Sequence, residues 1–181
     1  MDKIYFPISR TCSATFAVKE AGVRRKSYPF DWAGLSYKNL AYILDNGIDK
    51  IFSDYEIINH ESQELPIIWE KTYNMLLIHE KESQIEEIKS KYIKRYNRLI
   101  EDLKTSKEVT LVQSSSCERT IHSHFKDFEK HFKSPIPDES IDDNSIECVK
   151  ESILKINPNI NIKVTKYTVW DDVVEELKTN I

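Results

Sequence analysis

The stretch KIYFPISRTCSATFAVKEAG, residues 3–22, passes from a short apolar run into a helical pattern. Residues 3–8 predict a strand, and residues 13–21 predict a helix that ends at Gly22. Cys12 stands directly before this helix, where aligned backbone N–H groups favour the thiolate over the thiol. Cys12 is therefore a candidate nucleophile, and the alternative is a small side chain buried in the core.

A strand followed by a helix recurs along the chain. Further strands are predicted at residues 73–78, 109–112 and 160–165. Further helices are predicted at residues 37–44, 84–104, 117–132, 145–155 and 170–177. Residues 48–72 hold apolar side chains without a clear period, so their structure stays open. We expect α/β architecture: one domain over residues 1–181, with a largely parallel sheet flanked by helices.

The composition limits the classes of function. The chain has 181 residues, of which 40% are hydrophobic and 31% charged, as in folded globular proteins. A net charge of −4 argues against binding to nucleic acid or an anionic membrane. We find no apolar run long enough to span a bilayer and no secretory leader. An odd count of 3 cysteines argues against a disulfide framework, so we expect a cytoplasmic protein.

Cofactor and metal motifs are absent from the sequence. The chain holds only 3 glycines and has neither a G-x-G-x-x-G pattern nor a phosphate-binding loop. No pair of cysteines or histidines has the spacing of a zinc site. We therefore expect no cofactor and no metal.

Chemically capable side chains follow several of the predicted strands. Cys12, His79 and the serines at 114–116 each come just after a predicted strand. The carboxyl ends of neighbouring parallel strands lie at the same edge of a sheet. If these strands are parallel neighbours, the three groups could line one crevice. His79 is the candidate general base, because an imidazole within hydrogen-bond reach can take the proton of a thiol. The alternative is a strand-end histidine bonded to the backbone.

The other cysteines have different contexts. Cys117 begins the predicted helix at 117–132 and is a rival nucleophile, with Ser116 as the expected N-cap. Cys148 lies inside a helical pattern, and we expect it in the core.

A compact block, RRKSYPFDW at residues 24–32, follows the first helix. Asp31 stands between Phe30 and Trp32, so we expect it to be partly buried and to need a partner. It could orient the histidine, or pair with Arg24 or Arg25 to hold the loop. The two aromatic side chains are expected to pack the loop onto the core.

The helix predicted at 84–104 carries further charged side chains. Arg95 and Arg98 lie one turn apart on one face and, with Arg24 and Arg25, could hold a phosphate or carboxylate. The alternative is solvated charges in surface ion pairs. Glu87 and Lys91 have the spacing of an exposed i,i+4 pair.

The order of strand, Cys12, helix, the SYPFDW block at 27–32 and His79 resembles a family of inferred papain-like cysteine peptidases from bacteria and large DNA viruses. The stretch KYIKRYNR at 91–98 and the strand at 109–112 also fit, so the resemblance covers roughly residues 3–115. The chain departs from the family pattern at Ser9, where a glycine is usual, and at Glu80, where an aspartate usually follows the histidine.

The resemblance implies Cys12 as nucleophile, His79 as base and Asp31 as the acidic third member. It also implies an alternative fold class, an α+β papain-like arrangement in which the catalytic histidine sits on an antiparallel sheet.

We therefore expect a thiol-dependent hydrolase or acyltransferase with a Cys–His dyad that acts on a peptide, isopeptide or other small acyl substrate. The side chains expected to bind substrate are Arg24, Arg25, Trp32, Arg95 and Arg98. One alternative is a Rossmann-like transferase or binding protein whose arginines hold a phosphate-bearing ligand. The other is a non-catalytic interaction module with a degenerate site.

Overall fold

The computed structural model describes residues 2–8, 13–23, 26–59, 66–77, 79–81, 84–114, 143–167 and 170–179. The predicted helix at 117–132 lies outside these residues. The other predicted helices and strands are found close to their expected positions.

Strands β1 (Lys3–Pro7), β6 (Glu108–Ser114) and β7 (Asn161–Tyr167) form a parallel sheet in the order β1-β6-β7. Neighbouring side chains of β1 point to opposite faces, as in any strand. Phe6 enters the main core on one face, and Tyr5 packs against a smaller cluster on the other.

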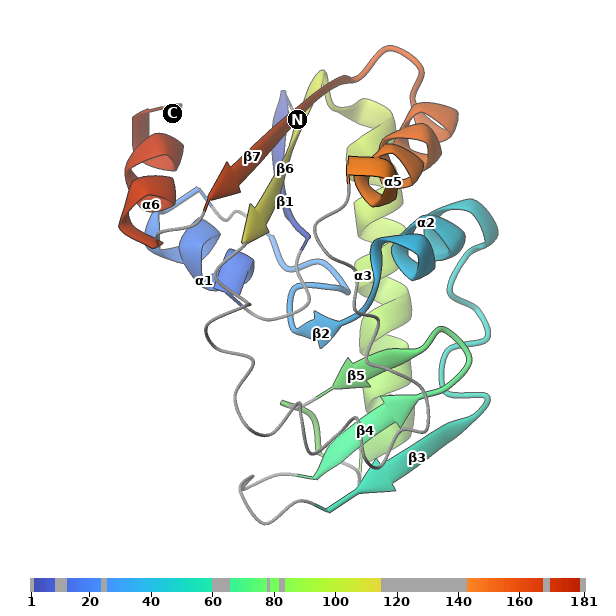
Figure 1. The fold of residues 1–181 in the computed structure, drawn as a ribbon. Helices are drawn as coiled ribbons and strands as arrows, with labels where there is room; N and C mark the ends of the chain where they lie inside the picture. The colour runs from blue at the N-terminus through green and yellow to red at the C-terminus, as the bar shows by residue number, and fades with distance from the viewer. Residues whose placement is uncertain are drawn as a thin grey trace.

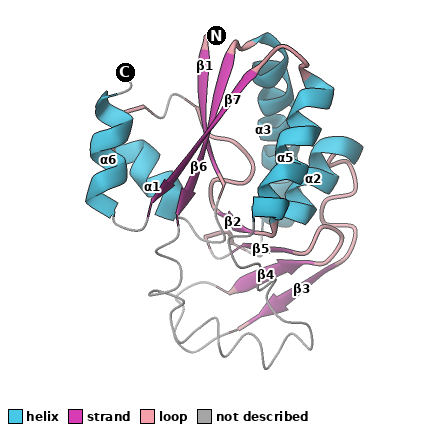
Figure 2. Ribbon diagram, turned by 45° about the horizontal axis from the view of Figure 1, so that its top comes forward, coloured by secondary structure: helices cyan, strands magenta, loops and turns pink. Residues whose placement is uncertain are grey.

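Helices cover both faces of this sheet (Figures 1 and 2). Helices α1 (Ser13–Glu20) and α6 (Trp170–Thr179) pack together over one face, where small side chains such as Ala17 allow close approach. Helices α2 (Tyr37–Asn46), α3 (Ile85–Thr105) and α5 (Asp143–Ile156) lie on the other face. The α/β architecture expected from the sequence is therefore confirmed.

A second, antiparallel sheet lies beyond the carboxyl edge of the parallel sheet (Figures 1 and 2). Its strands are β2 (Ala33–Gly34), β5 (Met75–Leu77), β4 (Ile67–Glu70) and β3 (Tyr55–Ile58), in that order. The sequence pattern predicted neither β3 nor β4. The side chains of β3 are largely exposed on both faces and those of β4 are largely buried, so neither strand shows a clear alternation of apolar and polar side chains.

This second sheet decides the strand order, which the sequence left open. Strands β1 and β6 are parallel neighbours, whereas β5, the strand before His79, pairs with β2 and β4 in the antiparallel sheet, so the condition for one shared crevice is not met by all three strands. His79 therefore approaches from a different sheet than the segment that carries Cys12.

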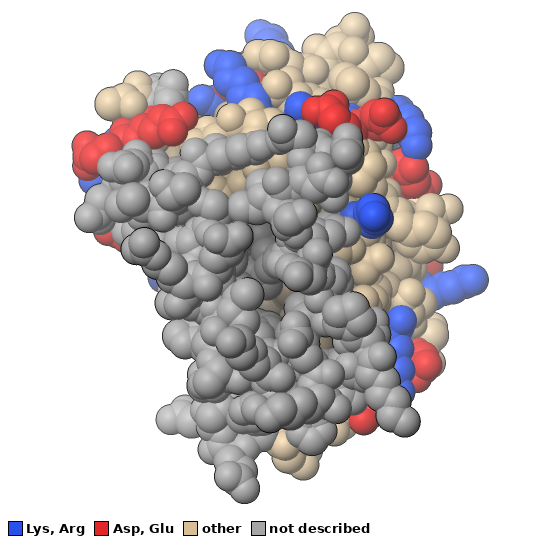
Figure 3. Space-filling view, in the orientation of Figure 1, with Lys and Arg blue, Asp and Glu red and all other residues tan. Residues whose placement is uncertain are grey.

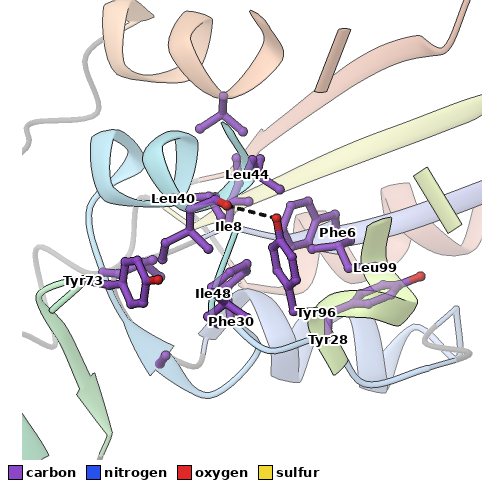
Figure 4. Close-up of a cluster of buried hydrophobic side chains, with 14 of the residues drawn as sticks. Phe6, Ile8, Tyr28, Phe30, Leu40, Leu44, Ile48, Tyr73, Tyr96 and Leu99 are labelled. Atoms are coloured by element: carbon purple, nitrogen blue, oxygen red, sulfur yellow. Dashed lines mark hydrogen bonds between the residues drawn. The ribbon is translucent and has the colours of Figure 1, made fainter. Parts of the chain in front are cut away.

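One continuous cluster of buried side chains joins the two sheets, and Figure 4 shows part of it. Phe6 of β1 contacts the rings of Tyr28 and Phe30, while Met75 and Leu77 of β5 belong to the same cluster. Burial of such apolar surface is the main favourable term in folding.

The surface is mixed in charge. On the described part of the face in Figure 3, basic and acidic side chains are interspersed. Among the described helices, none combines the length and the apolar character that crossing a bilayer would require.

A buried carboxylate organises the turn between β4 and β5. Glu70 has no exposed surface, and its oxygens accept the backbone N–H groups of Phe52 at 3.0 Å, Thr72 at 3.2 Å and Tyr73 at 2.8 Å. Hydrogen bonds to a charged acceptor are stronger than neutral ones. Glu70 therefore fixes the turn that leads into β5, the strand that precedes His79.

Replacing this carboxylate should destabilise the protein. We expect Glu70→Gln to lower the free energy of unfolding by about 2 to 3 kcal/mol, because a buried backbone N–H loses its acceptor. Urea denaturation at neutral pH measures the change. The matched control is Glu56→Gln on β3, whose exposed side chain pairs only with Lys71, and it should cost less than about 1 kcal/mol. Equal losses in both variants would contradict this role of Glu70.

Candidate active site

Loop residues 26–34 connect the parallel sheet, α3 and the antiparallel sheet. The hydroxyl of Tyr28 donates to the buried carboxylate of Asp102 on α3 at 2.9 Å, and the Lys26 ammonium bonds the same group at 2.6 Å. Burial and the bond to Asp102 hold the pKa of the Tyr28 hydroxyl above its usual range, so it stays a proton donor. These contacts attach the loop to α3.

Asp31 holds the loop internally and to α1. Its side chain is 2% exposed, and Oδ2 accepts the backbone N–H of Tyr28 at 3.1 Å. Its carbonyl oxygen accepts the hydroxyl of Thr15 from the first turn of α1. Asp31 is thus more deeply buried than the partial burial expected from the sequence, and the partners described here are Tyr28 and Thr15.

Trp32 bridges α1 and His79. Its ring lies edge-to-face against Phe16 at 5.1 Å and against the imidazole of His79 at 5.5 Å between ring centroids. Such perpendicular contacts between aromatic rings are favourable. Phe16 lies in the first turn of α1, which begins at the residue after Cys12. The histidine is thus two rings away from the helix that Cys12 precedes.

The pairing of β2 with β5 brings Trp32 and His79 together. Ala33 pairs with Leu77, so the residue before β2 and the segment after β5 lie at the same end of the strand pair. Desolvation against its neighbours lowers the pKa of His79 below its ordinary value, while the negative charge of Glu80 opposes this shift. His79 is consequently neutral at pH 7, the form that accepts a proton.

An ion pair attaches the His79 segment to α3. The carboxylate of Glu80 accepts from Nζ of Lys91 at 2.7 and 2.5 Å, and the Glu80 side chain is only 12% exposed. The predicted pair between Glu87 and Lys91 is therefore wrong. Lys91 turns instead to the carboxylate beside His79, because a partly buried charge gains more from pairing than a solvated one.

The end of β1 is also held in place. The N–H of Ile8 donates to Val112 at 2.9 Å, and its carbonyl accepts the hydroxyl of Tyr37 at 3.4 Å. Gln113, fully buried on β6, donates to the same hydroxyl at 2.7 Å. The end of β1 is thus bonded to β6 and to α2, at the point where the chain continues toward Cys12.

The two arginines predicted on one face of α3 do share it. Arg95 and Arg98 line an open groove together with Glu86, Glu87, Ser90, Lys91 and Lys94. Arg98 also donates to the carbonyl of Ser27 at 3.5 Å, next to the anchored loop.

Several predicted site residues lie outside the described part of the chain. These are Cys12, Arg24, Arg25, Cys117 and the serines at 115–116. Cys148 is partly buried and packs against the main core, as expected. Within the described ranges, no group of histidine, cysteine, aspartate and glutamate side chains could hold a metal ion.

Sequence reasoning missed the roles of Phe16, Thr15 and Asp102. Each acts through a contact with a distant part of the chain: Phe16 and Thr15 with residues 31–32, and Asp102 with residues 26–28. Local periodicity marks Asp102 only as one polar position in a helix. No signal in the sequence pointed to these contacts.

An anchored aromatic loop between a parallel and an antiparallel sheet, with a histidine two residues after a strand of the second sheet, defines a protein of mixed α/β architecture. The chain belongs to the family described as putative papain-like cysteine peptidase (DUF1796), whose match spans residues 3–130. No curated protein and no solved structure matches the chain.

Two substitutions should move the pKa of His79 in opposite directions. In Trp32→Leu the contacting indole is lost, so we expect a rise toward the ordinary value of about 6.5. In Glu80→Gln the nearby negative charge is lost, so we expect a further fall. Titration of the imidazole C–H signals by NMR, assigned with His79→Gln, gives both values. A wild-type pKa above 6.5, or shifts of the same sign, would contradict the assigned causes.

Proposed function

We propose that this protein is a thiol-dependent hydrolase or acyltransferase that uses a Cys12–His79 dyad on a peptide, an isopeptide or another small acyl compound. Membership of the papain-like peptidase family supports thiol chemistry. The observation that carries the choice of residues is the ring contact chain Phe16–Trp32–His79, since it joins the imidazole to the helix that follows Cys12.

The proposed reaction begins when the Cys12 thiol gives its proton to His79. The sulfur then attacks the acyl carbon, and the negative charge moves to the acyl oxygen, where N–H groups at the start of α1 stabilise it. Collapse of this intermediate breaks the bond to the leaving amine, which takes the proton from His79. Water attacks the resulting thioester in the same way and releases Cys12, while attack by another amine gives acyl transfer.

The state of His79 fits the first step. Its lowered pKa keeps the imidazole neutral at pH 7, so it can accept the proton of a thiol. Its side chain also stays accessible to solvent, which a substrate needs.

Asp31 takes the third role in this proposal as a positioning residue. Its carboxylate accepts the backbone N–H of Tyr28 within the loop, and its carbonyl accepts the hydroxyl of Thr15 on α1. The neighbouring Trp32 is therefore held between α1 and His79. The aromatic face of Trp32 would also contact the substrate beside the base.

Site-resolved alkylation tests the dyad. We expect iodoacetamide at about pH 6 to modify Cys12 faster than Cys148 and faster than free glutathione, because a neighbouring imidazole and a helix N-terminus favour the thiolate. His79→Ala should slow modification of Cys12 at least about tenfold. Mass spectrometry of the digested protein resolves the individual cysteines.

The matched control is Lys81→Ala, an exposed side chain two residues from His79, which should leave the rate unchanged. If Cys12 reacts no faster than an ordinary thiol, the dyad is excluded. In that case, a rise in the melting temperature on addition of a nucleotide would favour the alternative function, a transferase or binding protein for a phosphate-bearing ligand. No shift with nucleotides or nucleotide sugars would favour the non-catalytic module.

A further inference from the structure

Helix α3 carries a stripe of basic side chains along one groove. Lys94 and Arg95 lie three and four residues after Lys91, and Arg98 lies four and three residues after them. This spacing places all four on one side of the helix. All of them line the open groove described above. We call these four residues the α3 basic stripe.

Among the residues that the structure describes, most of the positive charge of the stripe has no acidic partner. Lys91 is paired with Glu80, but in the described ranges neither Lys94 nor Arg95 has an ion-pair partner. Within the same ranges Arg98 contacts only a carbonyl oxygen, at 3.5 Å. By contrast, Lys104 near the end of the same helix is paired with Glu101 at 2.9 Å. The stripe therefore offers cations to an external anion.

The sign of the charge changes along the groove. Glu86 and Glu87 line it at the first turn of α3, whereas Lys94, Arg95 and Arg98 line its other end. From Glu86 to Arg98 the helix rises about 18 Å, the length of an extended peptide of five or six residues. A nucleic acid or polyphosphate is anionic along its whole length, so part of it would be repelled by the two glutamates. A peptide with acidic side chains in only one part of its length can place them at the basic end of the groove and leave neutral residues beside the glutamates.

The groove is connected to the candidate base. Lys91, the first residue of the stripe and near the middle of the groove, donates to the carboxylate of Glu80, which directly follows His79. A peptide held along α3 thus passes the segment that presents the imidazole.

We propose that the α3 groove is a docking subsite for an acidic stretch of the peptide substrate, whose carboxylates bind Lys94, Arg95 and Arg98. This inference rests on the proposed function for the nature of the substrate. Arginine forms bidentate bonds with carboxylates, which gives the subsite its selectivity for acidic over neutral side chains.

Fluorescence anisotropy tests the subsite without requiring catalysis. The probe is a fluorescein-labelled hexapeptide with three consecutive glutamates, measured against the same peptide with glutamines, in about 50 mM salt to limit screening. We expect the glutamate peptide to bind at least about fivefold more tightly. The variant Lys94→Gln/Arg95→Gln/Arg98→Gln should weaken its binding about tenfold and leave binding of the glutamine peptide unchanged.

A control variant with the same change in net charge is Lys104→Gln/Lys107→Gln/Lys178→Gln, in which all three side chains are exposed and lie outside the groove. It should bind the glutamate peptide like the wild type. Equal binding of the two peptides, or an equal loss in the control variant, would overturn the subsite. So would tighter binding of a single-stranded oligonucleotide of equal charge, which would indicate a nucleic-acid surface instead.

The outcome is separable from that of the dyad. Cys12→Ser should bind the glutamate peptide like the wild type, because the subsite does not involve the thiol. The groove variant should in turn keep the wild-type rate of Cys12 alkylation by iodoacetamide, which has no acidic group to dock. If the alkylation experiment excludes the dyad while the glutamate peptide still binds, the groove remains an acidic-peptide site. Only the proposed chemistry of Cys12 and His79 then fails. If Cys12 is reactive and the glutamate peptide does not bind, the subsite alone is excluded.

Discussion

The bonds of Asp102 to Tyr28 and Lys26 hold residues 26–34 in place, and the surroundings of His79 depend on that loop. Asp102 is 7% exposed, and a carboxylate so buried is tolerated only with good partners. With the loop anchored, Phe30 enters the core, Trp32 reaches His79 and the chain continues into β2. A short aromatic segment thereby determines how the two sheets meet.

The two sheets contribute different parts of the candidate site. The parallel sheet delivers the chain toward Cys12 at its carboxyl edge, where sites in α/β proteins are usually built. The antiparallel sheet delivers His79 after β5 (Figure 1). The fold is thus α/β in its parallel sheet and helices, while His79 follows a strand of the antiparallel sheet. A junction between two such units is a common location for a binding site.

Helix α3 supports both the fold and the candidate site. Tyr96 packs in the core and its hydroxyl donates to Ile43 of α2 at 3.0 Å, while Asp102 holds the aromatic loop and Lys91 holds the segment of His79. The position of His79 is therefore coupled to α3 through both the loop and Glu80. A long helix is suited to this role, since its backbone hydrogen bonds keep distant side chains in a fixed relation.

The sequence by itself determined the positions of the described helices and of strands β1, β6 and β7, and it determined the family. Periodic apolar side chains and a specific motif are local properties, which a sequence shows directly. Tertiary structure alone decided the order of the strands, the second sheet and the partners of Glu80 and Asp102. The contact of Trp32 with His79 joins residues 47 positions apart in the sequence, counted from 32 to 79. Such contacts depend on how whole helices and strands pack together. The free energy of that packing comes from many side chains across the molecule, so no single segment of the sequence determines it.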